Sequence, residues 1–254
     1  VRIDSTGRTR FISRFAHEAS DLKYKDGKIY WTETMPDVRW SMGTRSNVRY
    51  ISRRGGVKKD LTRNRDGLLY NPSFDGDVLA TVRYYPEGHS ALVVDGQEYA
   101  APDSLQLVET AWMDGIPYVT AVSDNGYGVY AYDGGWKTVL APQPVMVKDF
   151  RSHGNELMFT CDRTGVNELY HLDPAEGKLI QKTSTRYGAE DFQYSGNWLY
   201  YSSQTLDGKK IYRTPVDSLM DKAVDFSDLH RYHIAEAVTA QEKAIALEKE
   251  ASTN

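Results

Sequence analysis

A turn that ends in glycine and is followed by a short strand occurs five times along this chain of 254 residues. The glycines are Gly27, Gly76, Gly115, Gly154 and Gly196, which are separated by 49, 39, 39 and 42 residues. A repeat of about 40 residues with several short strands is the period of a β-propeller blade, whose four-stranded sheet has apolar faces that only a neighbouring blade can cover. The spacing therefore predicts an all-β chain, a β-propeller of about five four-stranded blades.

Within each unit the strands follow in one order. The strand before the glycine turn is expected to be innermost and the strand after it second. The expected third strands are 47–51, 90–94, 127–132, 168–172 and 210–213, and the expected fourth strands are 57–61, 97–101, 136–140 and 178–182. The fifth unit has no clear fourth strand. A spare strand at 8–13 has no blade of its own, so it is a candidate to complete the fifth blade and remove an exposed sheet edge.

The pattern of short strands ends near residue 217. We therefore expect a propeller over 1–217, starting inside a repeat, and a linker with a helix over 218–254. Ser227 or Asp228 is the expected helix cap, and the apolar side of the helix contains Ile234, Val238 and Ile245. The helix is expected either to pack on the propeller or to join a further domain of a longer chain.

Composition excludes several function classes. A net charge of -4 gives no basic footprint for nucleic acid. The single cysteine, Cys161, cannot form an internal disulfide, and the six histidines lack metal-ligand spacing, so no metal or cofactor is expected. No apolar run approaches the ~18 residues of a membrane span.

The run from Thr160 to Lys178 is similar to the repeat of TolB-like, WD40-like β-propellers. That repeat has a Ser-Asp-Arg turn, then Gly and Asn, an aliphatic-Tyr strand, an Asp, and Gly followed by Lys or Glu; here Cys161 stands in place of the Ser. The loop within 34–50 is similar to the Pro-Asp-x-Arg-Trp loop in propeller regions of large bacterial envelope proteins, some fused to peptidase-like domains. The resemblance covers about residues 20–215, and it implies a periplasmic or cell-envelope location and a fold more than an activity.

In a propeller, the loops between second and third strands share one rim with the links between blades, and ligands usually bind there. The candidate ligand-binding residues on this rim are Asp37, Arg39, Trp40, Arg45, Tyr85, His89, Asp124, Tyr127, Asp162 and Arg163. Two alternatives stay open. Arg39 beside Trp40 either stacks on a sugar or holds a carboxylate, or else the loop folds Trp40 over a neighbouring blade. Asp162 and Arg163 either face a ligand or hold their own turn.

No G-x-S-x-G motif is present, so no catalytic nucleophile is indicated. We therefore expect a non-catalytic propeller domain of a larger bacterial protein that binds a protein, peptide or glycan through its loops. One alternative is a five-bladed glycoside hydrolase, with an acid pair drawn from Glu33, Asp37, Glu87, Asp124 and Asp162. The other is the gating propeller of a serine peptidase whose catalytic domain is absent.

Overall fold

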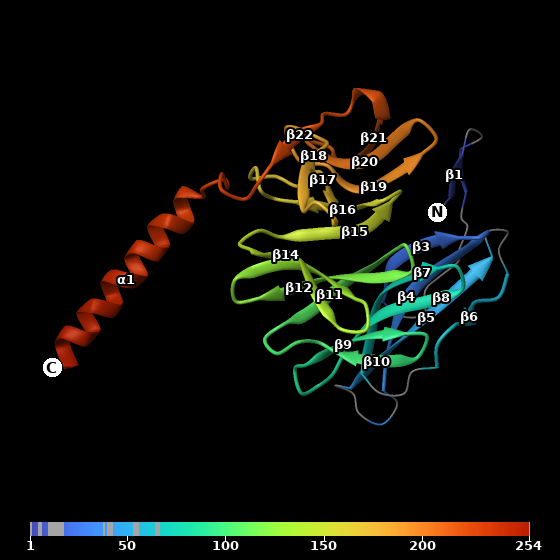
Figure 1. Ribbon diagram of the computed structural model, residues 1–254, viewed down its shortest axis with the longest axis horizontal. Helices are drawn as coiled ribbons and strands as arrows, with labels where there is room; N and C mark the ends of the chain where they lie inside the picture. The colour runs from blue at the N-terminus through green and yellow to red at the C-terminus, as the bar shows by residue number, and fades with distance from the viewer. Residues whose placement is uncertain are drawn as a thin grey trace. The chain divides into compact units, whose positions relative to one another are not determined.

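A computed structural model describes residues 2–4, 7–9, 18–37, 39, 43–52, 56–63 and 67–253 (Figure 1). The chain divides into two compact units. Unit 1 comprises Val1–Phe159 and Leu172–Gly177, and unit 2 comprises Thr160–His171 and Lys178–Asn254. Each unit is described below by itself.

Five antiparallel sheets follow one another along the chain, as a propeller of five blades requires. Blades 1 to 3 each have four strands in sequence order: β3 (Ala19–Lys25), β4 (Lys28–Pro36), β5 (Thr44–Ser52) and β6 (Lys59–Asp60); β7 (Leu68–Asp75), β8 (Val78–Tyr84), β9 (Ser90–Val94) and β10 (Gln97–Ala100); β11 (Gln106–Met113), β12 (Ile116–Ser123), β13 (Gly126–Tyr132) and β14 (Trp136–Gln143). The predicted all-β propeller class is confirmed.

Blades 4 and 5 depart from four strands. Blade 4 comprises β15 (Val147–His153), β16 (Glu156–Cys161), β17 (Glu168–Asp173), β18 (Lys178–Gln181) and β22 (Lys222–Val224). Blade 5 has three described strands: β19 (Glu190–Ser195), β20 (Trp198–Thr205) and β21 (Gly208–Pro215). The sequence did not predict β22, which pairs antiparallel with β18 although blade 5 lies between them in the chain.

The predicted glycine turns join the first and second strands of all five blades. Asp26 and Gly27, for example, have φ of 48° and 73°, which suits a tight hairpin turn with both central residues in the left-handed region. The turn at Asp114 and Gly115 repeats this geometry, with φ of 51° and 75°. The turns therefore set the strand pairing that the repeat predicted.

The innermost strands carry a repeated β-bulge that ties neighbouring blades together. Strand pairing shifts register between Ser20 and Lys23 in β3 and between Tyr70 and Ser73 in β7. The first bulge residues, Asp21 and Asn71, have φ of 56° and 52°, a conformation that Asp and Asn tolerate best after glycine. The Asn71 backbone N–H donates to the Asp21 carboxylate at 3.1 Å, so the bulge of blade 1 binds that of blade 2.

Burial follows the blade faces. In unit 1 a cluster of fully buried residues lies between blades 2 and 3, comprising Ala80, Val82, Leu92, Leu107, Val119 and Ala121. In unit 2, the side chains of Leu169, Phe192 and Leu199 are each at most 1% exposed. The sheets thus bury the apolar faces that the propeller prediction requires.

Both ends of the chain differ from expectation. Helix α1 (His233–Thr253) begins after the predicted caps, because Ser227 is engaged in a turn in which its N–H and hydroxyl both donate to the Asp225 carboxylate. Every described side chain of α1 from His233 to Lys249 is exposed.

Near the amino end, β2 (Gly7–Thr9) pairs with β1 (Arg2–Asp4), and residues 10–13 of the spare strand lie outside the described residues. A short 3-10 turn, η1 (Val216–Ser218), follows blade 5. The domain boundary at 217 stays a prediction.

Candidate functional site

Strands alternate in direction within each blade, so the β4–β5, β8–β9 and β12–β13 loops of unit 1 reach one edge of their sheets. The links from β6 to β7 and from β10 to β11 end at the same edge. We call this edge the loop face. The glycine turns lie at the opposite edge, together with the turns between third and fourth strands.

A hollow of about 640 Å³ opens on the loop face between blades 2 and 3. Its three walls come from the β8–β9 loop, the β10–β11 link and the β12–β13 turn, at 88–90, 100–106 and 122–124. We call it the loop-face hollow. Two of the predicted ligand-binding residues, His89 and Asp124, line it from different blades.

Ser90 fixes two of these walls. Its hydroxyl accepts a hydrogen bond from the Leu107 N–H at 2.9 Å, and its carbonyl accepts one from the Ala101 N–H at 3.0 Å. Ser90 begins the third strand of blade 2, while Leu107 belongs to the first strand of blade 3. The distance between the walls is therefore set by a side chain that is 1% exposed.

One lining residue, His89, stacks on Tyr85, which does not itself line the hollow. The rings of Tyr85 and His89 lie 4.3 Å apart at an interplanar angle of 16°. The loop closes on itself, because the Tyr85 N–H donates to the His89 carbonyl at 3.0 Å. The Tyr85 hydroxyl also donates to Glu98, which Arg83 pairs as well. Burial and the Glu98 contact raise the pKa of Tyr85, so the ring beneath His89 stays neutral and fixed.

The β12–β13 turn, which contains Asp124, has a backbone conformation that requires glycine at its end. Gly126, directly after this turn, has φ of 102°, and a Cβ there would lie 1.9 Å from the Gln143 carbonyl oxygen. Only glycine fits this close approach. The Asn125 N–H donates to the Ser123 hydroxyl at 3.2 Å, which leaves the Asp124 side chain exposed. Tyr127 lies in β13, half-buried, and does not line the hollow.

The blade 1 candidates lie elsewhere on the loop face. The Asp37 carboxylate accepts the Arg39 N–H at 2.7 Å, which makes a local turn and leaves Arg39 exposed. Arg45 lies in β5, and its buried Nε has no hydrogen-bond partner among the described residues. Trp40 lies outside the described residues.

Unit 2 uses Arg163 internally. The guanidinium Nε donates to the Asp225 carbonyl at 2.5 Å, and the Arg163 carbonyl accepts the His230 N–H at 2.9 Å. The Asp162 carbonyl accepts the Gly165 N–H at 2.8 Å and closes the turn. Arg163 is 8% exposed and ties the segment before α1 to this turn.

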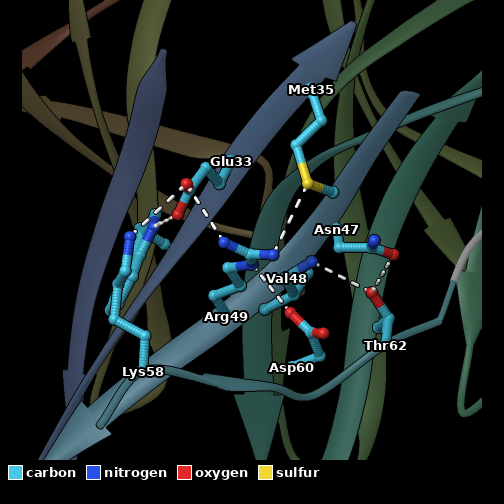
Figure 2. Close-up of polar contacts among 9 residues, drawn as sticks. Glu33, Met35, Asn47, Val48, Arg49, Lys58, Asp60 and Thr62 are labelled. Atoms are coloured by element: carbon cyan, nitrogen blue, oxygen red, sulfur yellow. Dashed lines mark hydrogen bonds and ion pairs between the residues drawn. The ribbon is translucent and has the colours of Figure 1, made fainter. Parts of the chain in front are cut away.

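Glu33, one of the acids considered for a glycosidase pair, belongs to a buried ionic cluster (Figure 2). Its fully buried carboxylate accepts the Trp31 Nε1–H at 3.0 Å and pairs with Arg49 at 3.1 Å and Lys58 at 3.6 Å. Burial opposes ionisation, but the Trp31 hydrogen bond and the two cations outweigh it, so the pKa of Glu33 lies below its ordinary value. Glu33 is thus a constantly charged counter-ion of its own blade.

Sequence reasoning missed a second set of charges, on the innermost strands. The Glu109 carboxylate accepts the Phe150 N–H at 2.6 Å, linking the bulge of blade 3 to blade 4. Burial raises the pKa of Glu109. Burial and the charge of Arg151 lower the pKa of Lys23. The sequence signal was that Glu109 and Lys23 fall in or directly after the bulge, four to six positions before the glycine of the following turn.

Metal and thiol chemistry have little support. The described residues include no group of three or more His, Cys, Asp or Glu that could hold a metal ion. Cys161 is buried, and burial raises the pKa of its thiol to about 12, so it is protonated and unreactive. Within the part of the chain that the structure describes, no helix has the length and apolarity needed to cross a bilayer.

The sequence matches no protein-family model, and a search among curated proteins finds no match either. Solved structures do match. TolB from Acinetobacter baumannii is 16% identical with a TM-score of 0.56, covering 70% of this chain and 48% of that one. A putative TolB from Agrobacterium tumefaciens is 12% identical with a TM-score of 0.61, covering 82% and 80%.

A third match is puromycin hydrolase in complex with PGG, at 11% identity and a TM-score of 0.57. It covers 82% of this chain and 38% of the hydrolase, and the chain spans about half of the Acinetobacter protein. At these identities the likeness concerns the fold. Together with the five consecutive blades, it confirms the resemblance that the Thr160–Lys178 repeat indicated, and this chain has the fold of TolB-like β-propellers.

Proposed function

We propose that this chain is a non-catalytic propeller domain of a larger bacterial protein of the periplasm or cell envelope. It binds a protein, peptide or glycan through the loop-face hollow. The observation that carries the proposal is the hollow itself, which holds about 640 Å³ between walls that Ser90 fixes before any ligand arrives. Preformed concave sites of this size are typical of ligand binding.

The lining suits a polymer segment with many hydrogen-bonding groups. His89 and Gln106 offer donors, Asp103 and Asp124 accept, and Leu105 adds apolar surface. His89, held in place by the stacked Tyr85 ring, presents a flat aromatic surface, which favours a sugar ring or a peptide plane. Ser90, Ser104 and Ser123 line the hollow, but no hydrogen bond among the described residues joins any of them to a histidine, so the arrangement supports recognition more than turnover.

A gating role in a serine peptidase is the second candidate. It is favoured by the likeness to puromycin hydrolase, of which this chain spans only 38%. In that case the neighbouring domain of the parent protein is an α/β-hydrolase, and the propeller admits its substrates. A glycosidase receives less support, because Glu33 is neutralised by Arg49 and Lys58.

The test is to screen the chain against peptide and glycan arrays and to measure the affinity of each hit by calorimetry. H89A/D124A should weaken binding at least tenfold. The matched control is D133A, an exposed aspartate of blade 3 in the turn between β13 and β14, at the opposite edge, which should leave affinity unchanged. Equal loss in both variants, or hydrolysis of a hit, would overturn the proposal.

A further inference from the structure

A second hollow, of about 520 Å³, lies between blades 1 and 2. The turn residues around it come from the edge opposite the loop face: Lys25 and Lys28 beside the β3–β4 turn, Asp77 in the β7–β8 turn, and Asp95 in the β9–β10 turn. We call it the turn-side pocket. It shares no lining residue with the loop-face hollow.

The inner part of the turn-side pocket is apolar and aromatic. Tyr30 and Phe74 lie with ring centroids 4.6 Å apart, one from each blade. Leu69, Leu79 and Val93 complete this floor. Tyr30 and Leu69 are 6% and 3% exposed, so the floor is part of the packed core and is preformed.

Four basic and two acidic side chains surround the floor: Lys25, Lys28, Arg63, Arg83, Asp77 and Asp95. Within the described part of the chain, two of the four cations are in ion pairs and two are not. Lys25 pairs with Asp26 at 2.6 Å and with Asp77 at 3.5 Å, and Arg83 pairs with Glu98. Lys28 and Arg63 are exposed and make no ion pair with any carboxylate in the described residues. Lys28 lies over the Tyr50 ring, 5.3 Å from its centroid, which holds its charge near the mouth.

We propose that the turn-side pocket binds a peptide segment in which an apolar side chain stands beside a carboxylate. The apolar group packs on Tyr30 and Phe74, and a carboxylate beside it meets either Lys28 at the turn edge or Arg63, which follows β6. The charges select this occupant, because a basic segment would bring like charge to both cations. An uncharged apolar segment would gain the floor but leave the two cations uncompensated.

The site is separate from the proposed function, because the two hollows share no lining residue. H89A/D124A should therefore leave it unaffected. A propeller with both sites would hold two segments at once, one in each hollow.

Three short peptides serve as probes: acetyl-Glu-Phe-Glu-amide, acetyl-Lys-Phe-Lys-amide and acetyl-Glu-Ala-Glu-amide. Each is titrated into the full chain labelled with ¹⁵N, and amide shifts are followed. The acidic aromatic peptide should shift the amides at 61–63, 76–79 and 95–96, and should bind at least tenfold more tightly than the other two. Its affinity should fall as salt rises from about 50 to 300 mM, since the contact is partly exposed.

K28E/R63E should weaken the acidic aromatic peptide at least tenfold and improve the basic one. The control K137E/K178E reverses two exposed lysines on other blades and should leave both affinities unchanged. Both doubles change surface residues, so folding is checked by the unchanged spectrum outside the pocket. Equal affinities for the three peptides, shifts confined to other residues, or equal losses in the two doubles would overturn the proposal.

Discussion

Blades 1 and 4 build the same junction from different residues. In blade 1, Thr62 Oγ1 accepts the Val48 N–H at 2.9 Å, and the Leu61 N–H donates to the Val48 carbonyl at 2.8 Å. In blade 4, Thr183 Oγ1 accepts the Leu169 N–H at 2.9 Å, and the Lys182 N–H donates to the Leu169 carbonyl at 2.8 Å. A threonine thus holds the end of the fourth strand on the third strand in both blades.

The two junctions differ in the side chain that the threonine hydroxyl contacts. This side chain belongs to the residue just before Val48 in blade 1 and just before Leu169 in blade 4. The Thr62 hydroxyl points to the neutral amide oxygen of Asn47 at 3.3 Å, whereas the Thr183 hydroxyl donates to the carboxylate of Glu168. Glu168 is 1% exposed and also accepts the N–H and the hydroxyl of Thr185. The repeat is therefore kept by backbone geometry, while the acceptor is free to differ. This explains how blade 1 folds as blade 4 does with little likeness in sequence.

The largest effect should come from removing the two acceptors. E168A leaves two hydroxyls and an N–H without their acceptor in a buried place, and we expect the free energy of unfolding to fall by about 3 kcal/mol. N47A removes the weak neutral contact to Thr62 and should cost about 1 kcal/mol. Urea unfolding measures both. Equal losses would mean that the two junctions do not differ in strength.

A smaller effect separates the two threonines. T62V removes the acceptor for the Val48 N–H and should cost about 1 kcal/mol. T183V removes the equivalent acceptor and also a donor to Glu168, so about 2 kcal/mol is expected. T62S and T183S keep the hydroxyl and are the matched controls. A serine variant as unstable as the valine variant would assign the loss to packing.

The pH dependence should be the smallest effect, and it has opposite signs in the two blades. Burial raises the pKa of Glu168, so its share of stability is present below the ordinary value of 4.5 and is lost as pH rises through the folded pKa. The pKa of Glu33 in blade 1 is lowered, so its share is present above 4.5 and is lost as pH falls through the folded pKa.

Unfolding measured from about pH 3 to pH 7 tests this contrast, and each carboxylate can change the slope by at most about 1.4 kcal/mol per pH unit. E168Q should flatten the slope above pH 4.5, and E33Q should flatten it below. If both variants changed the slope on the same side of pH 4.5, the prediction that the two pKa values shift in opposite directions would be wrong.

The sequence predicted what depends on local conformation. The third strand at 90–94 matches β9, and the glycine turns join the expected strands, because positive φ and alternating side chains are properties of neighbouring residues. β22 was missed because three residues give no pattern, and its partner β18 lies about 40 residues earlier. Such pairings depend on tertiary contacts that no local window contains.

The candidate site divides in the same way. His89 and Asp124 were predicted to share a rim from strand order alone, and the loop-face hollow brings them together. Arg163 was not expected to hold the chain before α1, because its partner is a backbone carbonyl at Asp225 and any residue type supplies one. The turn-side pocket could not be predicted from the sequence, because its floor forms only when Tyr30 and Phe74 from adjoining blades come together.

β22 also decides how unit 2 would carry tension. Any pull applied through α1 meets the Arg163–Asp225 hydrogen bond and then the pairing of β22 with β18 before it reaches β21. Lys182 strengthens this connection, because its ammonium group pairs with Asp221 and its backbone carbonyl accepts the Met220 N–H at 3.1 Å. A load applied to α1 would therefore reach blade 4, through β22 and β18, before it reached blade 5.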